Sequence, residues 1–83
     1  MALSEQEIMA GLAELISTEM EVPADSITAT QSLADDLGVD SLSMTTIVYN
    51  AEEKFGVRIP DDEAGNLVTV QDAVDFISKN QTS

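Results

Sequence analysis

The stretch from Gly38 to Phe55 constrains the fold of this chain more than any other part of it. Asp40 followed by Ser41 is a favoured helix start, because the Asp carboxylate accepts a hydrogen bond from a first-turn amide that has no helical partner. Apolar residues then recur at helical spacing until Gly56 ends the pattern. The inward stripe consists of Met44, Ile47, Val48, Ala51 and Phe55. We therefore expect an amphipathic helix over residues 41–55.

Ser41 lies at the mouth of this expected helix. Unpaired amides and the positive end of the helix dipole converge there. An anionic group attached to the Ser41 hydroxyl would be favoured for the same reason that helix N-termini bind phosphate. The residues alone thus describe a place where a phosphate group could be attached.

Three further helices are expected on either side of the central one. Ser4 with Glu7 forms a capping box, and apolar spacing behind it predicts a first helix over residues 5–18. Pro60 and the acids that follow it begin a short third helix, whose charge complements its N-terminal dipole. Thr69 caps the last helix, which ends near Lys79, and the residues after Lys79 are expected to fray.

The segment from Met20 to Asp40 carries turn signals rather than helical spacing. A loop of this length is unusual in a compact domain unless it is functional or pinned. Apolar residues at intervals supply the pins: Val22, Ile27, Leu33, Leu37 and Val39. We predict an all-α fold with a single domain over residues 1–83, a small four-helix bundle (three main helices plus one short helix) with a long ordered loop between the first two helices.

The composition excludes several function classes. Sixteen Asp plus Glu against three Lys plus Arg give a formal net charge of −13, which repels nucleic acid and anionic membranes and favours basic patches on partners. We expect the acids to gather around the central helix. The chain has neither Cys nor His, so it lacks a thiol nucleophile and the commonest general base. No long apolar run or signal peptide is found, so a cytoplasmic monomer without a membrane span is expected.

Several motifs in register resemble the acyl carrier proteins of dissociated fatty acid synthases. They are Asp35-Asp36-Leu37-Gly38, Asp40-Ser41-Leu42, Glu52-Glu53-Lys54-Phe55 and Ile59-Pro60-Asp61-Asp62. The resemblance extends from about Glu5 to Lys79 with the spacing of that family. One tripeptide recurs by chance, but these segments in register over one small acidic chain make a specific match.

The resemblance implies a carrier rather than an enzyme. A phosphopantetheinyl transferase would move phosphopantetheine from coenzyme A onto Ser41, and the arm would supply the thiol that carries growing acyl chains as thioesters. The implied partners are the synthase enzymes (malonyl transferase, ketosynthases, ketoreductase, dehydratase and enoyl reductase) and acyltransferases, all bound through basic patches.

The family shelters acyl chains between its helices. The matching positions in this chain are Ile47, Ala51, Phe55, Ile59, Leu67, Val70 and Ala73. Shelter is favourable because burying a methylene is worth about 0.8 kcal/mol. Ala51 stands where related carriers often have Leu, which implies a roomier cavity suited to long chains.

The docking face also departs from the family pattern, because Ser43 and Thr46 stand where many fatty-acid carriers have acids. Leu42 and Tyr49 lie beside Ser41 on the expected helix, and apolar anchors with a charged rim are typical of transient interfaces. The residues expected to recognise partners are Asp36, Asp40, Leu42, Met44, Tyr49, Glu52 and Glu53.

Other interpretations stay open from the sequence. A carrier in a polyketide or an aminoacyl or special acyl pathway is the nearest alternative. Asp40 and Ser41 could also be only the start of a helix in an acidic interaction module. A calcium sensor is disfavoured because the EF-hand loop pattern is absent, and the adjacent Asp35 and Asp36 lack further oxygen ligands, so no metal site is expected.

Overall fold

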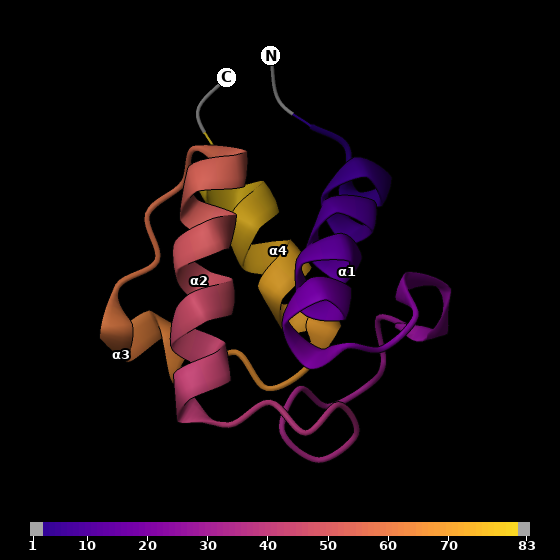
Figure 1. Cartoon of the computed structure of the whole chain (residues 1–83). Coiled ribbons are helices and arrows are strands. Elements are labelled where there is room, and N and C mark those ends of the chain that lie inside the picture. Colours follow the sequence, from indigo (N-terminus) through magenta and orange to yellow (C-terminus); the bar gives the residue numbers. More distant parts are fainter. Residues whose placement is uncertain (1–2, 82–83) are drawn as a thin grey trace.

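The structure is a computed structural model that describes residues 3–81, and these residues form four α-helices and one short 3₁₀ turn. The elements are α1 (Glu5–Met20), η1 (Ala24–Ser26), α2 (Ser41–Phe55), α3 (Asp61–Ala64) and α4 (Val70–Asn80). Helix α1 packs against both α2 and α4, and the short α3 lies beside α2 in the connection to α4 (Figure 1). The predicted bundle of three main helices and one short helix is confirmed.

The helices begin where the capping signals predict. Ser4 forms a capping box with Glu7 at the start of α1, and Thr69 forms one with Asp72 at the start of α4. Asp40 caps α2 through its carboxylate. These contacts span three residues of sequence, so they form without help from the rest of the chain.

The core is apolar and is shared by all the long helices. It contains Ile8, Leu12, Ala13, Ile16, Ile27, Leu33, Val39, Ile47, Ala51, Val57, Ile59, Val70, Ala73, Val74 and Ile77. None of the buried side chains in the described part of the chain is polar or charged. The periodic apolar stripes thus face one another, as amphipathic helices require.

The long loop between α1 and α2 is ordered, as predicted. Of its apolar residues, Ile27, Leu33 and Val39 are buried. Hydrogen bonds tie the loop to the approach to α4, since the Leu33 amide donates to the Val68 carbonyl at 2.9 Å. One isolated antiparallel bridge pairs Ser32 with Thr69. The loop therefore holds a fixed course beside the start of α4.

Three expectations from the sequence are wrong. Helix α1 extends to Met20 and ends at Glu21 in the left-handed conformation (φ 57°), two residues beyond the predicted end. The tail does not fray from Asn80 as expected: α4 ends at Asn80, next to the predicted end near Lys79, and the Gln81 side chain both accepts from the Leu3 amide and donates to the Leu3 carbonyl at 2.9 Å. Residues 82–83 of the predicted frayed tail lie outside the described residues.

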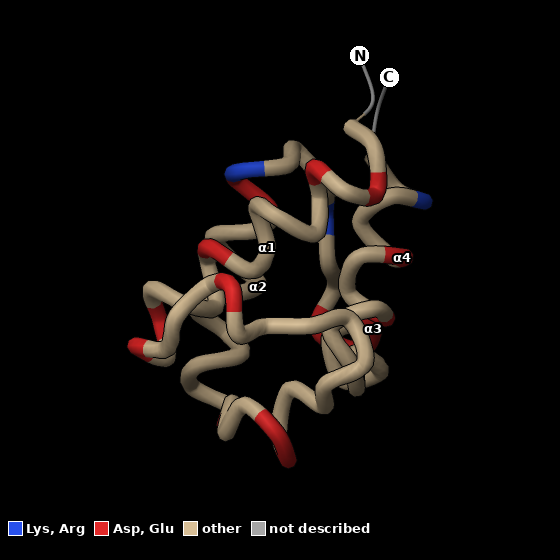
Figure 2. The backbone as a smooth tube through the Cα atoms, turned by 90° about the vertical axis from the view of Figure 1, so that its right-hand side faces the viewer, with Lys and Arg blue, Asp and Glu red and all other residues tan. Residues whose placement is uncertain are grey.

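The third correction concerns charge. Acidic residues occur on every helix and on the η1 turn. Figure 2 shows them spread over the backbone rather than gathered around α2. Helix α2 has no acid in its first turn. Acidity is therefore a property of the whole surface, and it does not by itself identify one functional face.

Candidate functional site

Asp40 and Ser41 form the start of α2. The Asp40 carboxylate accepts a hydrogen bond from the Ser43 amide at 2.8 Å, and the Asp40 carbonyl accepts one from the Met44 amide at 2.8 Å. The hydrogen bonds from Ser43, first of all the one from its amide, hold the pKa of Asp40 below its usual value. The Asp40 carboxylate is thus kept ionised as a helix cap, and its negative charge interacts favourably with the partial positive charge of the helix N-terminus.

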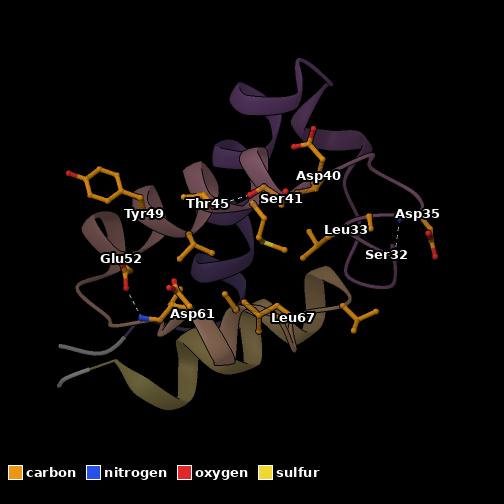
Figure 3. Close-up of a pocket in the computed structure, with 18 residues that line it drawn as sticks. Ser32, Leu33, Asp35, Asp40, Ser41, Thr45, Tyr49, Glu52, Asp61 and Leu67 are labelled. Carbon is orange, nitrogen blue, oxygen red and sulfur yellow. Dashed lines mark hydrogen bonds between the residues drawn. The ribbon is translucent and has the colours of Figure 1, made fainter.

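Ser41 is the first residue of α2, and it is exposed. Its carbonyl accepts a hydrogen bond from the Thr45 hydroxyl at 2.9 Å, a contact drawn in Figure 3. Within residues 3–81, the first-turn amides of α2 make no hydrogen bond to any other element. The Ser41 hydroxyl therefore lies at an accessible helix N-terminus.

A groove of about 820 Å³ runs along α2 from Ser41, and we call it the Ser41 groove. Figure 3 shows α2 forming one wall, with the loop at Leu33 and the segment at Leu67 facing it. The lining residues are Ser32, Leu33, Ala34, Asp35, Val39, Asp40, Ser41, Met44, Thr45, Val48, Tyr49, Glu52, Ile59, Asp61, Ala64, Gly65, Leu67 and Val68. An exposed hydroxyl at the end of a largely apolar groove is suited to a covalently attached flexible group.

The expected docking residues divide between this groove and the surface outside it. Those that line it are Asp40, Met44, Tyr49 and Glu52, whereas Asp36, Leu42 and Glu53 do not. Leu42 is 80% exposed and Tyr49 is 60% exposed, so both offer apolar surface to a partner. Met44 is half-buried and packs against the core.

Besides Asp40, two of the carboxylates named for docking are engaged within the fold. Glu52 Oε2 accepts a hydrogen bond from the Ile59 amide at 2.7 Å, which fastens the connector after α2 to the helix (Figure 3). Asp36 Oδ2 accepts from the Ser32 amide at 2.7 Å within the loop. Each therefore has a structural contact that the sequence pattern did not reveal.

Five of the seven expected acyl-chain residues line a small void inside the bundle. It measures about 20 Å³ and is lined by Leu12, Ile16, Leu33, Met44, Ile47, Val48, Ala51, Ile59, Leu67, Ala73 and Ile77. A void of this size has room for about one water molecule. An acyl chain would therefore need the surrounding side chains to move apart.

Phe55 and Val70 are not among the residues that line this void. The Phe55 ring lies over Gly11 of α1, so closely that a Cβ added at Gly11 would come within 2.9 Å of its Cζ. Val70 is fully buried elsewhere in the core. Close packing between α1 and α2 therefore explains why residue 11 is Gly.

Val68 is a groove residue that the sequence analysis did not single out. It is 59% exposed, and with Leu42 and Tyr49 it makes up the large hydrophobic side chains that are exposed among residues 3–81. Its backbone is fixed, because its carbonyl accepts from the Leu33 amide and its amide donates to the Asp72 carboxylate at 3.1 Å. No periodic signal marks Val68, since it precedes a helix.

Among the described residues, no group of three or more Asp, Glu, His or Cys side chains is placed to hold a metal ion. Over the same residues, each helix is too short or too polar to cross a membrane.

The chain is similar to known proteins over nearly its whole length. Residues 10–77 match the family model described as the phosphopantetheine attachment site. The chain is 60% identical over 78 residues to an acyl carrier protein of Kineococcus radiotolerans, an alignment that covers 94% of this chain and 96% of the relative. It is 59% identical over 81 residues to one from Beutenbergia cavernae, covering 98% of this chain and 99% of the relative.

A solved structure gives the same result for the fold. The acyl carrier protein from Enterococcus faecalis, described for its high thermal stability, superposes with a TM-score of 0.80 at 34% sequence identity. The match covers 95% of this chain and 100% of that chain. Sequence and fold thus point to the same group of proteins.

Proposed function

The chain belongs to the acyl carrier protein family, and from that premise we propose that Ser41 is the residue that holds its phosphopantetheine. The protein acts as a carrier in fatty acid synthesis and bears phosphopantetheine covalently. The observation that carries the assignment to Ser41 is its exposed hydroxyl at the open N-terminus of α2, beside the Ser41 groove.

The proposed attachment would take place at the Ser41 hydroxyl. Ser41 Oγ would form the new bond to phosphorus, its proton would pass to a base on the transferase, and the bond between that phosphorus and the adenosine bisphosphate half of coenzyme A would break. The chain has no His or Cys to take that proton itself. The helix dipole of α2 then stabilises the phosphodiester charge.

The attached arm supplies the thiol that this Cys-free chain lacks, and acyl groups are carried on that thiol as thioesters. The residues of the chain position the arm and present it to enzymes, and the carrier performs no catalysis. Acyl chains are proposed to enter the bundle at the void lined by Met44 and Leu67, where Ile47, Ala51, Ile59 and Ala73 supply another part of the wall.

Partners are proposed to dock on the exposed side of α2, with Leu42 and Tyr49 as apolar anchors. The proposed partners are a phosphopantetheinyl transferase, a malonyl transferase, ketosynthases, a ketoreductase, a dehydratase, an enoyl reductase and acyltransferases. Asp40 and Glu53 supply exposed negative charge, which speeds encounter with basic patches. We place these events in the cytoplasm and expect a monomer.

The alternative, a carrier for polyketide or aminoacyl groups, is not favoured. The relatives compared above are named simply acyl carrier proteins, and their alignments cover 94% and 98% of the chain. A purely structural acidic module is disfavoured by the family match over residues 10–77.

The test is intact mass before and after incubation with coenzyme A and a broad-specificity phosphopantetheinyl transferase. The wild type should gain one phosphopantetheine. A Ser43→Ala control should gain one as well, because it keeps Ser41 and removes only a half-buried hydroxyl two residues further along α2. Ser41→Ala should gain nothing. Modification of Ser41→Ala, or loss of modification in folded Ser43→Ala alone, would contradict the assignment.

A further inference from the structure

A second groove lies away from Ser41, between the first half of α1, the η1 turn and the start of α4. We call it the α1–α4 groove, and it measures about 350 Å³. Its lining residues are Glu5, Gln6, Met9, Ala10, Ala13, Ala24, Ile27, Ala29, Gln71 and Val74. It shares no lining residue with the Ser41 groove. Figure 1 shows α2 and the η1 turn on opposite sides of α1.

The floor of the α1–α4 groove is apolar, and two of the exposed residues that line it have small side chains. Ala13, Ile27 and Val74 are buried at its base. Ala10 and Ala24, which also line it, are exposed and carry only a methyl group. Small side chains let the backbone of a partner approach closely, and this leaves room for an inserted apolar side chain.

Hydrogen bonds hold the walls of this groove in place. The Gln71 amide donates to the Ala29 carbonyl at 2.9 Å, which joins α4 to the loop. The Gln71 side chain donates to the Asp75 carboxylate at 2.7 Å. A groove with fixed walls spares a partner the entropy of ordering them.

Charge decides what kind of partner fits. Glu5 lines the groove, Asp25 adjoins it beside Ala24, and Asp75 is joined to it through Gln71. The cations of the chain, Lys54, Arg58 and Lys79, do not line it. A net charge of −13 also opposes a second copy of the chain, a nucleic acid or an anionic membrane. An apolar floor with an acidic surround fits a cationic segment.

We propose that the α1–α4 groove binds a cationic amphipathic helix of a partner protein, with its apolar row on the groove floor and its Lys or Arg side chains toward Glu5, Asp25 and Asp75. Because the two grooves are separate, such a partner could hold the carrier while another protein acts on Ser41. The proposal concerns a surface that shares no lining residue with the Ser41 groove, and it does not depend on modification of Ser41.

The experiment uses two synthetic peptides with the same Leu and Lys content. One has Leu at positions i, i+4 and i+7 so that a helix carries an apolar stripe, and the other is scrambled and has no stripe. Affinity for the full chain is measured by fluorescence anisotropy at physiological salt, and the contact site is mapped by amide chemical shifts. The striped peptide should bind about tenfold more tightly, since one buried Leu accounts for such a ratio.

Two matched variants locate the site. Ala10 lines the α1–α4 groove and Ala34 lines the Ser41 groove, and both are exposed. Ala10→Lys and Ala34→Lys each add one positive charge, so they differ only in where the lysine is placed. Ala10→Lys should weaken binding of the striped peptide by about tenfold through steric filling and charge repulsion, whereas Ala34→Lys should change it by less than about twofold. Circular dichroism checks that both variants fold.

Three outcomes would overturn the proposal. Equal affinity for the striped and scrambled peptides would mean that charge alone attracts them. A larger loss in Ala34→Lys, with shifts at Tyr49 and Val68, would assign the peptide to the Ser41 groove. Absence of binding by the striped peptide would show that the groove does not accept a cationic helix. Shifts confined to the α1–α4 groove residues, with loss in Ala10→Lys, would support it.

Discussion

Helices α2 and α4 both begin with a side-chain cap, but the backbone amides at their N-termini differ in how many hydrogen-bond partners they have. At α4 the amides of the first two residues donate to the Gln31 and Ala29 carbonyls, at 3.1 Å and 2.9 Å. The next two amides donate to the hydroxyl and the carbonyl of Thr69. The Asp72 carboxylate closes the capping box from within the helix. Every amide of this helix terminus therefore has a protein partner.

At α2 the cap is Asp40 alone. It pairs with the amides of Ser43 and Met44, and no other element among residues 3–81 contributes an acceptor. The loop residues that accept hydrogen bonds from the α4 amides accept none from the first turn of α2, and Ser41 is exposed. The comparison teaches that a cap fixes where a helix begins, whereas the neighbouring loop decides whether its N-terminus is available for chemistry.

The largest expected difference between the two helices concerns stability. Ile77 of α4 is almost fully buried, whereas Val48 of α2 is half-buried on the groove wall. Ile77→Ala should lower the free energy of unfolding by about 3 kcal/mol, because it removes buried methyl groups and leaves a cavity. Val48→Ala should cost about 1 kcal/mol, since the site is already open to solvent. Urea titration measures both, and equal losses would contradict a closed α4 beside an open α2.

A smaller effect is expected at the cap of α4. Thr69→Ala should lower the free energy of unfolding by about 1 kcal/mol, because the third amide of the helix loses its acceptor. Thr46→Ala is the control, since its exposed hydroxyl bonds only to a carbonyl within α2; it should stay within about 0.5 kcal/mol of the wild type. A control loss as large as that of Thr69→Ala would mean that the cap is not what stabilises α4.

The caps also predict a pH dependence. Hydrogen bonds hold the pKa of Asp40 and of Asp72 below the usual value, the Thr69 amide being the main cause at Asp72. A carboxylate whose pKa is lowered by folding stabilises the protein above its unfolded pKa, and this contribution is lost as the pH falls through its folded pKa.

The measurement compares the wild type with Asp40→Asn and Asp72→Asn, which do not titrate. The stability difference from each variant should be full above about pH 5 and should shrink toward about pH 2. Asp35→Asn serves as the one-charge control, because among residues 3–81 the Asp35 carboxylate accepts no hydrogen bond from a helix amide, and only the Asp35 amide is bonded, to the Ser32 hydroxyl. Differences that stay constant with pH would contradict a stabilising role of the ionised caps.

The smallest effect on stability is expected on the rim of the Ser41 groove. Tyr49→Ala and Val68→Ala should each change the free energy of unfolding by less than about 0.5 kcal/mol, because both side chains are largely exposed. Each should nevertheless raise the KM of a ketosynthase for the loaded carrier by about fivefold, as loss of an interface anchor does. Unchanged KM values in both variants would remove this rim from the docking surface.

The local features of the chain follow from sequence alone. Ser4, Asp40 and Thr69 predicted three helix starts, because a cap acts on amides two or three residues away. The apolar spacing predicted which faces are buried, since helical geometry repeats the same way in every helix. The lack of Cys and the placement of Ser41 at a helix mouth likewise needed no tertiary information.

Only the tertiary structure decided how these parts meet. It joined the Leu33 loop to the approach to α4, placed Val68 opposite α2, and gave the Glu52 carboxylate to the Ile59 amide. Such contacts link residues that are separated along the chain, and no periodic pattern records them. The sequence determined where Ser41 lies along its helix, and the packing of distant segments determined that its helix terminus stays open beside a groove.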